Sequence, residues 1–522
     1  MTKTPVTEFA SDSPSPVATP GGPSSSPTPE QKGFFGHPRG LSTLFFTEMW
    51  ERFSYYGMRA LLILFMTAAA EKGGLGFRAE KAGAIYGLYG AGVYLTAMPG
   101  GWLADRILGQ RRAVLFGGCI IALGHFSMAL PGTFFFFLGL VLIVLGTGLL
   151  KPNISAMVGG LYPEGDARRD AGFSIFYMGI NIGAFTAPIV VGLLGERVNW
   201  HVGFGAAGVG MVFGVIQYLL GGRHLGEVGR KPRNADLRTE APGQPEKSGG
   251  SRMAGLTVVG VLVGLLVVLQ LLGVVDLTSA VGLARAGGFI IVTLALAFFA
   301  YQFTAGGLDA TEKRRLAVIG VFFIASTLFW AGFEQAGSSL NLFARDTTDR
   351  VVFGWEIPAS TLQAVNALFI IALAPVFAWM WVRLNKRGVE PSSPAKFSLG
   401  LVLMGAGFAV MVVASLAAAG GHKVSPVWLV ITYLLHTLGE LSLSPVGLST
   451  VTKLAPQRVV GQMMGVWFMS MSLGNLIAGQ LAGLLGTNPT PIFGAVAAVA
   501  IGAGLLLAIS VRPLRRMMGG VH

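Results

Sequence analysis

The sequence predicts an all-α integral membrane protein with fourteen transmembrane helices, arranged as two six-helix bundles plus two additional helices. Three observations support this fold class. The chain is 52% hydrophobic and only 12% charged, about half the charged fraction usual in soluble domains. Long apolar runs alternate with short polar loops, and each run approaches the roughly 20 residues needed to cross a bilayer. Lys and Arg are also distributed unequally between alternate loops.

The expected spans fall into groups of six, two and six. The first group comprises 41–69, 82–104, 112–131, 134–157, 171–195 and 200–221. The longest polar interruption of the chain separates it from the second group, 254–275 and 282–303. The third group comprises 315–341, 359–383, 397–420, 426–451, 460–485 and 490–511. Two six-helix halves around a midplane site are typical of secondary transporters.

This grouping predicts five regions. Residues 1–35 are rich in Pro, Ser and Thr and are expected to form a disordered cytoplasmic tail, not a signal peptide. An N-terminal six-helix bundle at 36–221 and a cytoplasmic linker at 222–253 follow. A two-helix insertion is expected at 254–311, and a C-terminal six-helix bundle with a short tail at 312–522. The inserted pair is expected to lie at the periphery, because it offers no interior polar group.

The basic residues predict the orientation of the chain. If both termini share one side, the loops and tails on that side hold 27 Lys and Arg and the opposite loops hold 8. The positive-inside rule then places both termini in the cytoplasm, as expected for a multi-pass protein of the cell inner membrane. Because the net charge of +13 follows this topology, it does not indicate nucleic-acid binding. We expect a monomer in the lipid bilayer.

Ionisable residues inside the membrane mark functional sites. Seven lie in or near the interiors of spans: Glu48, Glu51, Arg52, Arg59, Lys151, Glu334 and Glu440. Four carboxylates therefore face three cations, and full ionisation leaves one net negative charge in a medium of low dielectric. This imbalance favours protonation of one carboxylate, although a charged substrate would also close the sum. The single cysteine, Cys119, excludes an intramolecular disulfide and a Cys-based metal site, and no cofactor is expected.

Six of the polar side chains in the first span share one helical face. At about 100° per residue, an arc of roughly 140° contains Glu48, Glu51, Arg52, Tyr55, Tyr56 and Arg59. Glu48 and Arg52 are i,i+4 partners. The alternative is an ion-pair network that only fixes helix packing, but Arg59 and Tyr56 exceed what one such pair needs. The stripe therefore predicts a functional surface facing the bundle interior.

Several motifs resemble known transporter signatures. The loop GGWLADRILGQRR at 100–112 resembles the signature loop of the major facilitator superfamily. The stretch EMWERFSYYG at 48–57 is similar to the E-x-x-E-R-F-x-Y-Y-G hallmark of the proton-dependent oligopeptide transporter (POT/PTR) family. Four further stretches resemble other motifs of that family: LLKPNISAMVG (149–159), FYMGINIGA (176–184), FWAGFEQAGSSLN (329–341) and GELSLSPVGLS (439–449). The resemblance covers about 36–512 and implies the bacterial fourteen-helix form of the major facilitator fold.

The resemblance implies a proton-coupled symporter that imports di- and tripeptides by alternating access, and not an enzyme. It implies proton coupling by Glu48, Glu51, Arg52, Lys151 and Glu334. It implies substrate binding by Arg59, Tyr56, Tyr94, Lys151, Asn181, Asn366, Glu440 and Trp467. In this scheme Lys151 and Arg59 lie by the peptide carboxylate. The peptide amino terminus is held by Asn181, Asn366 and Glu440, the two tyrosines lie near the peptide backbone, and Trp467 is an aromatic wall.

The chemistry of a dipeptide fits such a site. Its two charged ends are a fixed distance apart whatever its side chains, so cations on one half and a carboxylate on the other can bind every dipeptide alike. Glu334 lies alone in an apolar span, where desolvation favours its neutral form until it is loaded. The sequence departs from the family at Ala367, which follows Asn366 where proline is common. The second span has no histidine, so coupling must rest on carboxylates.

Three other functions remain as alternatives. The same fold carries other anions, such as nitrate, in distant relatives, but Glu440 together with Lys151 favours a zwitterion. A membrane enzyme lacks support, because no metal-ligand cluster or nucleophile–base pair has a useful spacing. A channel would show downhill flux without saturation.

Overall fold

The computed structural model describes residues 33–519, except 164, 231–263, 265, 266, 269, 274 and 487. Six helices form the first half: α1 (Gly40–Thr67), α2 (Ala79–Leu103), α3 (Gln110–Met128), α4 (Thr133–Gly160), α5 (Arg169–Arg197) and α6 (Trp200–Gly221). Six helices were expected there, and their positions agree with these. Residues 1–32 of the predicted N-terminal tail, most of the linker and most of the span 254–275 lie outside the described residues.

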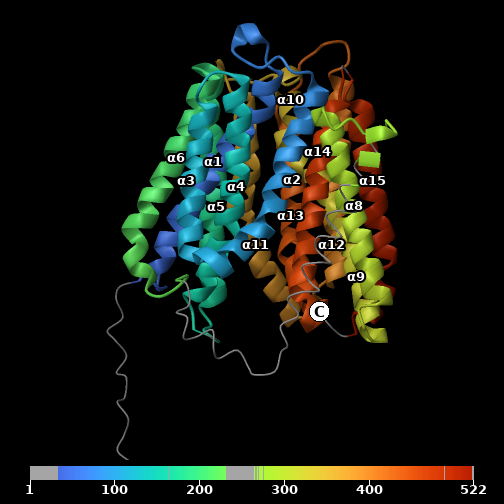
Figure 1. Ribbon diagram of the computed structural model, residues 1–522. Coiled ribbons are helices and arrows are strands. Elements are labelled where there is room, and N and C mark those ends of the chain that lie inside the picture. The colour runs from blue at the N-terminus through green and yellow to red at the C-terminus, as the bar shows by residue number, and fades with distance from the viewer. Residues whose placement is uncertain are drawn as a thin grey trace, which may run out of the picture.

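The later part of the chain forms the second half. Its long helices are α9 (Ala310–Phe333), α11 (Ala364–Lys386), α12 (Ser393–Ala417), α13 (Val427–Leu454), α14 (Val460–Gly483) and α15 (Thr490–Ile509). Shorter elements are α10 (Ser339–Asp346), α16 (Val511–Met518), η5 (Glu334–Gly337), η6 (Ala359–Gln363) and η7 (Gln457–Val459). A hairpin of β1 (Val351–Val352) and β2 (Trp355–Glu356) precedes η6. The two halves stand side by side as bundles of roughly parallel helices, with α10 at the upper end in Figure 1.

The expected single helix over 315–341 is wrong in one respect. The α-helix α9 ends at Phe333, the 3₁₀ turn η5 follows, and α10 begins only at Ser339. Glycine and serine are weak helix formers, because glycine has excess backbone freedom and serine competes for backbone hydrogen bonds. At Gly337 a side chain is also excluded, since a Cβ there would lie 2.0 Å from the Tyr86 hydroxyl of α2. The break thus brings η5 against the first half.

The halves meet along α2 with α14 and along α5 with α11 and η6. Glycines allow the α2–α14 approach. A Cβ on Gly83 would lie 2.2 Å from the carbonyl oxygen of Gly479, and a Cβ on Gly479 would lie 2.3 Å from that of Gly83. Small residues of this kind are the usual means of close helix packing in membranes. In Figure 1, α2 and α14 lie next to each other near the middle of the molecule.

The second helix of the insertion, α8 (Ala280–Thr304), lies against α2 and α14 at the side of the molecule (Figure 1). Two small or apolar residues of α8, Ala284 and Ile291, are buried in this contact. The expectation that the insertion has no interior polar group is wrong for this helix. Gln302 is only 3% exposed and its amide donates to the Gln462 side chain of α14 at 3.3 Å. The helix is therefore fixed to the second half by a buried hydrogen bond.

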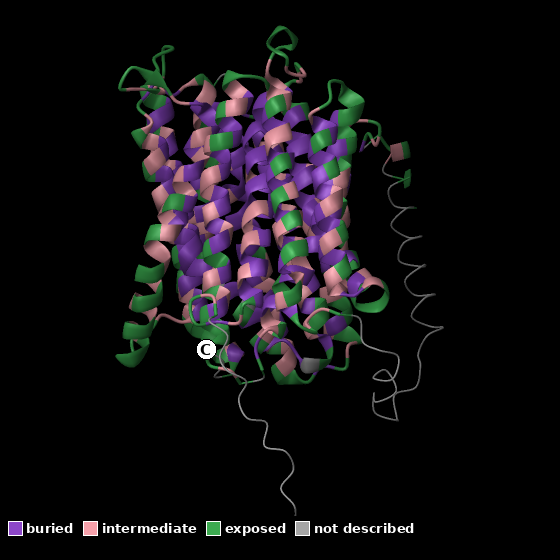
Figure 2. Cartoon of the chain, turned by 90° about the vertical axis from the view of Figure 1, so that its left-hand side faces the viewer, coloured by how far each residue is buried: buried purple, intermediate pink, exposed green. Residues whose placement is uncertain are grey.

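The lateral surface of the bundle suits a bilayer. Figure 2 shows buried residues in the interior of the bundle and exposed residues on its flanks and at its ends. The exposed side chains include many large apolar ones, among them Leu123, Phe134, Leu220, Leu506 and Ile509, which would be an aggregation hazard in water. Among the described residues, nine helices are long and apolar enough to cross a membrane by themselves. The first helix is not among them, since it contains Glu48, Glu51, Arg52 and Arg59.

Candidate functional site

The first cluster of the site consists of Glu48, Glu51 and Arg52 on α1 and is called the α1 knot here. The guanidinium Nε of Arg52 lies 3.1 Å from Glu48 Oε1 and also pairs with Glu51 Oε2. All three residues are at most 3% exposed. The second oxygen of each carboxylate and Nη2 of Arg52 have no hydrogen-bond partner among the described residues. Two carboxylates therefore share one arginine, and each keeps one oxygen free to accept a proton or another cation.

Lys151 on α4 lies beside this knot without joining it. Its ammonium is 4.6 Å from the centre of the Tyr94 ring on α2, which is a cation–π distance. It interacts electrostatically with Glu48 and Glu51, but the described part of the chain holds no carboxylate within 4 Å of it. The lysine is therefore a second cation near the two acids, available to an anionic group.

The second cluster joins the two halves. Arg59 of α1 places Nη2 at 2.6 Å from Glu334 Oε2 of η5 and donates from Nε to the Tyr86 hydroxyl at 2.6 Å. Arg59 is 6% exposed and Glu334 is 4% exposed. The sequence-based expectation that Glu334 lies alone is therefore wrong, because the helix break presents its carboxylate to the cation of the opposite half. A proton on Glu334 would remove this bridge.

The groups expected to hold a peptide amino terminus lie at two places. On the second half, the Asn366 amide of α11 donates to Thr437 Oγ1 of α13 at 2.9 Å and is next to the carboxylate of Glu440. Glu440 is 8% exposed, and its Oε2 has no partner among the described residues. On the first half, Asn181 of α5 uses its amide on the Tyr177 carbonyl of its own helix.

Tyr56 connects these clusters. It interacts electrostatically with four ionisable groups of the site: Arg52, Arg59, Glu334 and Glu440. Its ring lies 5.7 Å from the Arg59 guanidinium carbon. The structure therefore brings the first-half cations and the second-half carboxylates around one interior region. Trp467 of α14 is 6% exposed and packs edge-on to Phe397 of α12.

Two participants were not assigned to the site from sequence. Tyr86 bridges Arg59 and the Glu334 backbone carbonyl, to which its hydroxyl donates at 3.4 Å. It precedes Tyr94 by eight residues on α2, so extending the polar-stripe argument from the first helix to the second could have found it. Thr437 is one turn before Glu440 on α13 and holds the Asn366 amide. No sequence signal separates it from other buried threonines.

Comparisons with known proteins place the chain in a family. The model of the POT family matches residues 111–237 and 289–498. The chain belongs to the POT family. It is 45% identical over 507 residues to the peptide transporter YePEPT of Yersinia enterocolitica subsp. palearctica, covering 95% of this chain and 98% of that one. It is 39% identical over 503 residues to a di-/tripeptide transporter of Lactococcus lactis, covering 94% and 99%.

A solved POT family structure gives the same fold. The crystal structure of a peptide transporter POT variant in complex with alafosfalin superposes with a TM-score of 0.82 at 43% identity, covering 94% of this chain and 98% of that one. This likeness and the helical architecture confirm the expected two-bundle fold of the major facilitator type. The protein is a multi-pass membrane transporter of this family.

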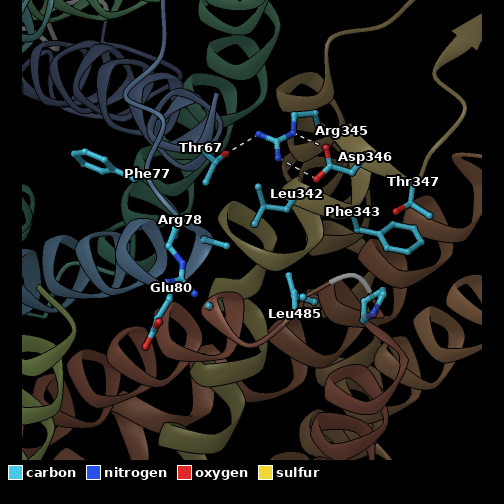
Figure 3. Close-up of a pocket in the computed structure, with 14 residues that line it drawn as sticks. Thr67, Phe77, Arg78, Glu80, Leu342, Phe343, Arg345, Asp346, Thr347 and Leu485 are labelled. Carbon is cyan, nitrogen blue, oxygen red and sulfur yellow. Dashed lines mark hydrogen bonds and ion pairs between the residues drawn. The ribbon is translucent and has the colours of Figure 1, made fainter. Parts of the chain in front are cut away.

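A surface cavity of about 680 Å³ lies at the α10 end of the molecule, and none of the cluster residues described above lines it. Figure 3 shows its wall, to which α1, α2 and α10 contribute. Arg345 of α10 donates to Thr67 of α1 at 2.6 Å and pairs with Asp346 at 2.7 Å. The cavity thus lies where the two halves meet at this end.

Proposed function

We propose that this chain is a proton-coupled symporter that imports di- and tripeptides by alternating access. The observation that carries the proposal is the charge arrangement around Tyr56. Tyr56 interacts electrostatically with two cations of the first half, Arg52 and Arg59, and with Glu440 of the second half. The buried Oε2 of Glu440 has no partner among the described residues. The named relatives, a peptide transporter and a di-/tripeptide transporter, support a peptide cargo.

A zwitterionic peptide fits this arrangement better than a simple anion. The peptide carboxylate would bind between Lys151 and Arg59, and the peptide ammonium would bind Glu440 with the Asn366 and Asn181 amides. Charge-assisted hydrogen bonds of this kind are about twice as strong as neutral ones. A nitrate ion would leave Glu440 buried and uncompensated, so the nitrate alternative is not favoured. Tyr56 and Tyr94 would lie along the peptide backbone, and Trp467 would border the side-chain space.

Protons would act through the two carboxylate clusters. Protonation of Glu334 removes its ion pair with Arg59 and frees Arg59 for the peptide carboxylate. In the α1 knot, protonation of Glu48 or Glu51 leaves Arg52 with a single carboxylate, and Lys151 then loses an electrostatic partner. The proton on Glu334 breaks a contact between the halves, whereas a proton on Glu48 or Glu51 changes the charge within the first half. Each of these changes would bias a two-state equilibrium.

The distribution of Lys and Arg supports an orientation in the inner membrane with both termini in the cytoplasm. The α10 end then faces outward. The two six-helix halves would move relative to each other during transport, and the two-helix insertion would be an accessory to them. We expect one chain to be sufficient for transport.

Uptake in proteoliposomes tests the proposal. Purified protein is reconstituted, a labelled dipeptide is added outside, and an inward proton gradient is imposed. We expect accumulation above the outside concentration, competition by unlabelled di- and tripeptides, and no competition by nitrate. Accumulation without a gradient, or displacement by nitrate and not by peptides, would contradict the proposal.

A further inference from the structure

The end of α5 is attached to the second half by a carboxylate that the transport site does not use. Glu196 Oε2 accepts a hydrogen bond from the backbone N–H of Ala359 at 2.9 Å. Glu196 Oε1 accepts from the backbone N–H of Ser360 at 2.9 Å and from the Ser360 hydroxyl at 2.5 Å. Three donors of one half thus converge on one side chain of the other.

The local sequence makes this attachment specific. Ala359 and Ser360 begin the helical run Ala359–Lys386, so their N–H groups have no acceptor within that run. A carboxylate facing such N–H groups is favoured by both hydrogen bonding and charge. Close approach is needed as well. At Gly192, one turn before Glu196, a Cβ would lie 2.1 Å from the Ser360 hydroxyl, so only glycine admits this contact.

The next residue of α5 strengthens the attachment. Arg197 donates to the backbone carbonyl of Glu356 and lies 3.9 Å from the carboxylate of Glu356. Its guanidinium carbon is 5.9 Å from the Trp355 ring centre. Both partners belong to β2. The hairpin is itself held by Arg350, which donates to the Ile357 carbonyl at 2.6 Å and to Glu356 at 2.7 Å.

We propose that Glu196 and Arg197, with η6 and β2, form a clasp that holds the two halves in contact at the α10 end and so stabilises the state in which that end is closed. Glu196 is its main positioning residue. This inference rests on the alternating-access part of the proposed function, because only a transporter that opens this end must break the clasp in each cycle.

The clasp is separate from the Arg59–Glu334 bridge. Arg59 lies eight residues before the end of α1, about 12 Å along the axis at 1.5 Å per residue, whereas Glu196 is the penultimate residue of α5. Substrate and protons act on the Arg59 cluster directly. Opening the α10 end requires that the clasp separate too, so its strength sets part of the balance between the two states.

Distance measurements between spin labels test the clasp. The single native cysteine is first removed by Cys119→Ala. One label pair is then placed at the α10 end (Leu130→Cys and His422→Cys) and another at the opposite end (Ala167→Cys and Lys386→Cys). All four positions are exposed, Leu130 by about half. Double electron–electron resonance in nanodiscs is compared for the parent, Glu196→Ala and Ser360→Ala. Glu71→Ala is the matched control, since Glu71 is an exposed acid in η1 (Ala70–Lys72) at the same end.

We expect Glu196→Ala to raise the ratio of long to short distances at the α10 end about tenfold, equivalent to about 1.4 kcal/mol, and to shorten distances at the opposite end. Ser360→Ala, which keeps two of the three hydrogen bonds, should shift both pairs less, and Glu71→Ala should shift neither. Unchanged distances at the α10 end would overturn the proposal. Longer distances there without a change at the opposite end would overturn it too, because they indicate local fraying. The readout needs no substrate, so a protein that shifts but fails to carry peptides refutes the proposed function and not the clasp.

Discussion

Arg59 and Glu334 form a buried ion pair, 2.6 Å from Nη2 to Oε2, that joins the first helix to the break between α9 and α10. It is a bond between the halves of a transporter and is made of a titratable acid and a permanent cation. Losing the charge of Glu334, by protonation or by mutation, therefore changes how the halves are held together.

Glu334→Gln tests this bridge. The amide keeps the size of the side chain and removes the charge, so a proton gradient no longer acts at this position. We expect proton-driven dipeptide accumulation to fall by at least about tenfold, while exchange of internal for external peptide remains. Proteoliposome uptake with and without a gradient measures both. The exposed acid Glu71 provides a control, as Glu71→Gln should accumulate peptide normally. Full uphill accumulation by Glu334→Gln would remove this residue from coupling.

Glu440→Gln tests the proposed ammonium site. A hydrogen bond to a charged group contributes about 1.5–3 kcal/mol, so we expect the KM for dipeptides to rise about tenfold to a hundredfold. An N-acetylated dipeptide lacks the ammonium, and its much weaker uptake should change little. Competition assays in proteoliposomes compare the two substrates. An equal loss for both would mean that Glu440 has a structural role only.

Arg52→Ala tests the knot on α1. Removing the cation leaves Glu48 and Glu51 buried without their shared partner, and breaking a buried pair costs about 3–5 kcal/mol. We expect a lower midpoint of thermal unfolding in detergent. The matched control is Arg230→Ala, which breaks the exposed pair with Glu227, a loss of about 0–1 kcal/mol. Similar midpoints for the two variants would show that the knot does not stabilise the fold.

Gly83→Ala tests the contact between the halves along α2 and α14. The added Cβ would approach the Gly479 carbonyl to 2.2 Å, and the helices must separate to admit it, at a cost of about 1–3 kcal/mol. We expect a lower unfolding midpoint. Gly502→Ala on α15 is the control, because a Cβ there meets nothing within 4 Å. A Gly83 variant as stable as the parent would mean that this interface is not closely packed.

The sequence was sufficient for those features that depend on local periodicity. The spacing of Glu48 and Arg52 predicted their i,i+4 ion pair, and the apolar runs predicted the described spans. The pairing of Arg59 with Glu334 was not predictable in this way, because the partners are far apart in sequence and meet only through the break at η5. The polar and small residues at 334–339 signal a weak point in the helix, but they do not show which side chain of the other half Glu334 meets.

The clasp at Glu196 illustrates the same limit. A single acid at the end of an apolar helix is indistinguishable in sequence from a solvated loop residue. Its role emerges only when the packing of α5 on η6 places three donors around it. Tyr86 likewise reads as one of several tyrosines until the fold brings its hydroxyl to Arg59.

Dipeptide-driven proton entry tests the central claim most directly. Proteoliposomes with a pH-sensitive dye inside and no imposed gradient receive an inward dipeptide gradient. We predict that the interior acidifies as the dipeptide enters, that nitrate produces no such change, and that Glu334→Gln abolishes it. Peptide entry without acidification, or acidification driven by nitrate, would contradict proton-coupled peptide symport.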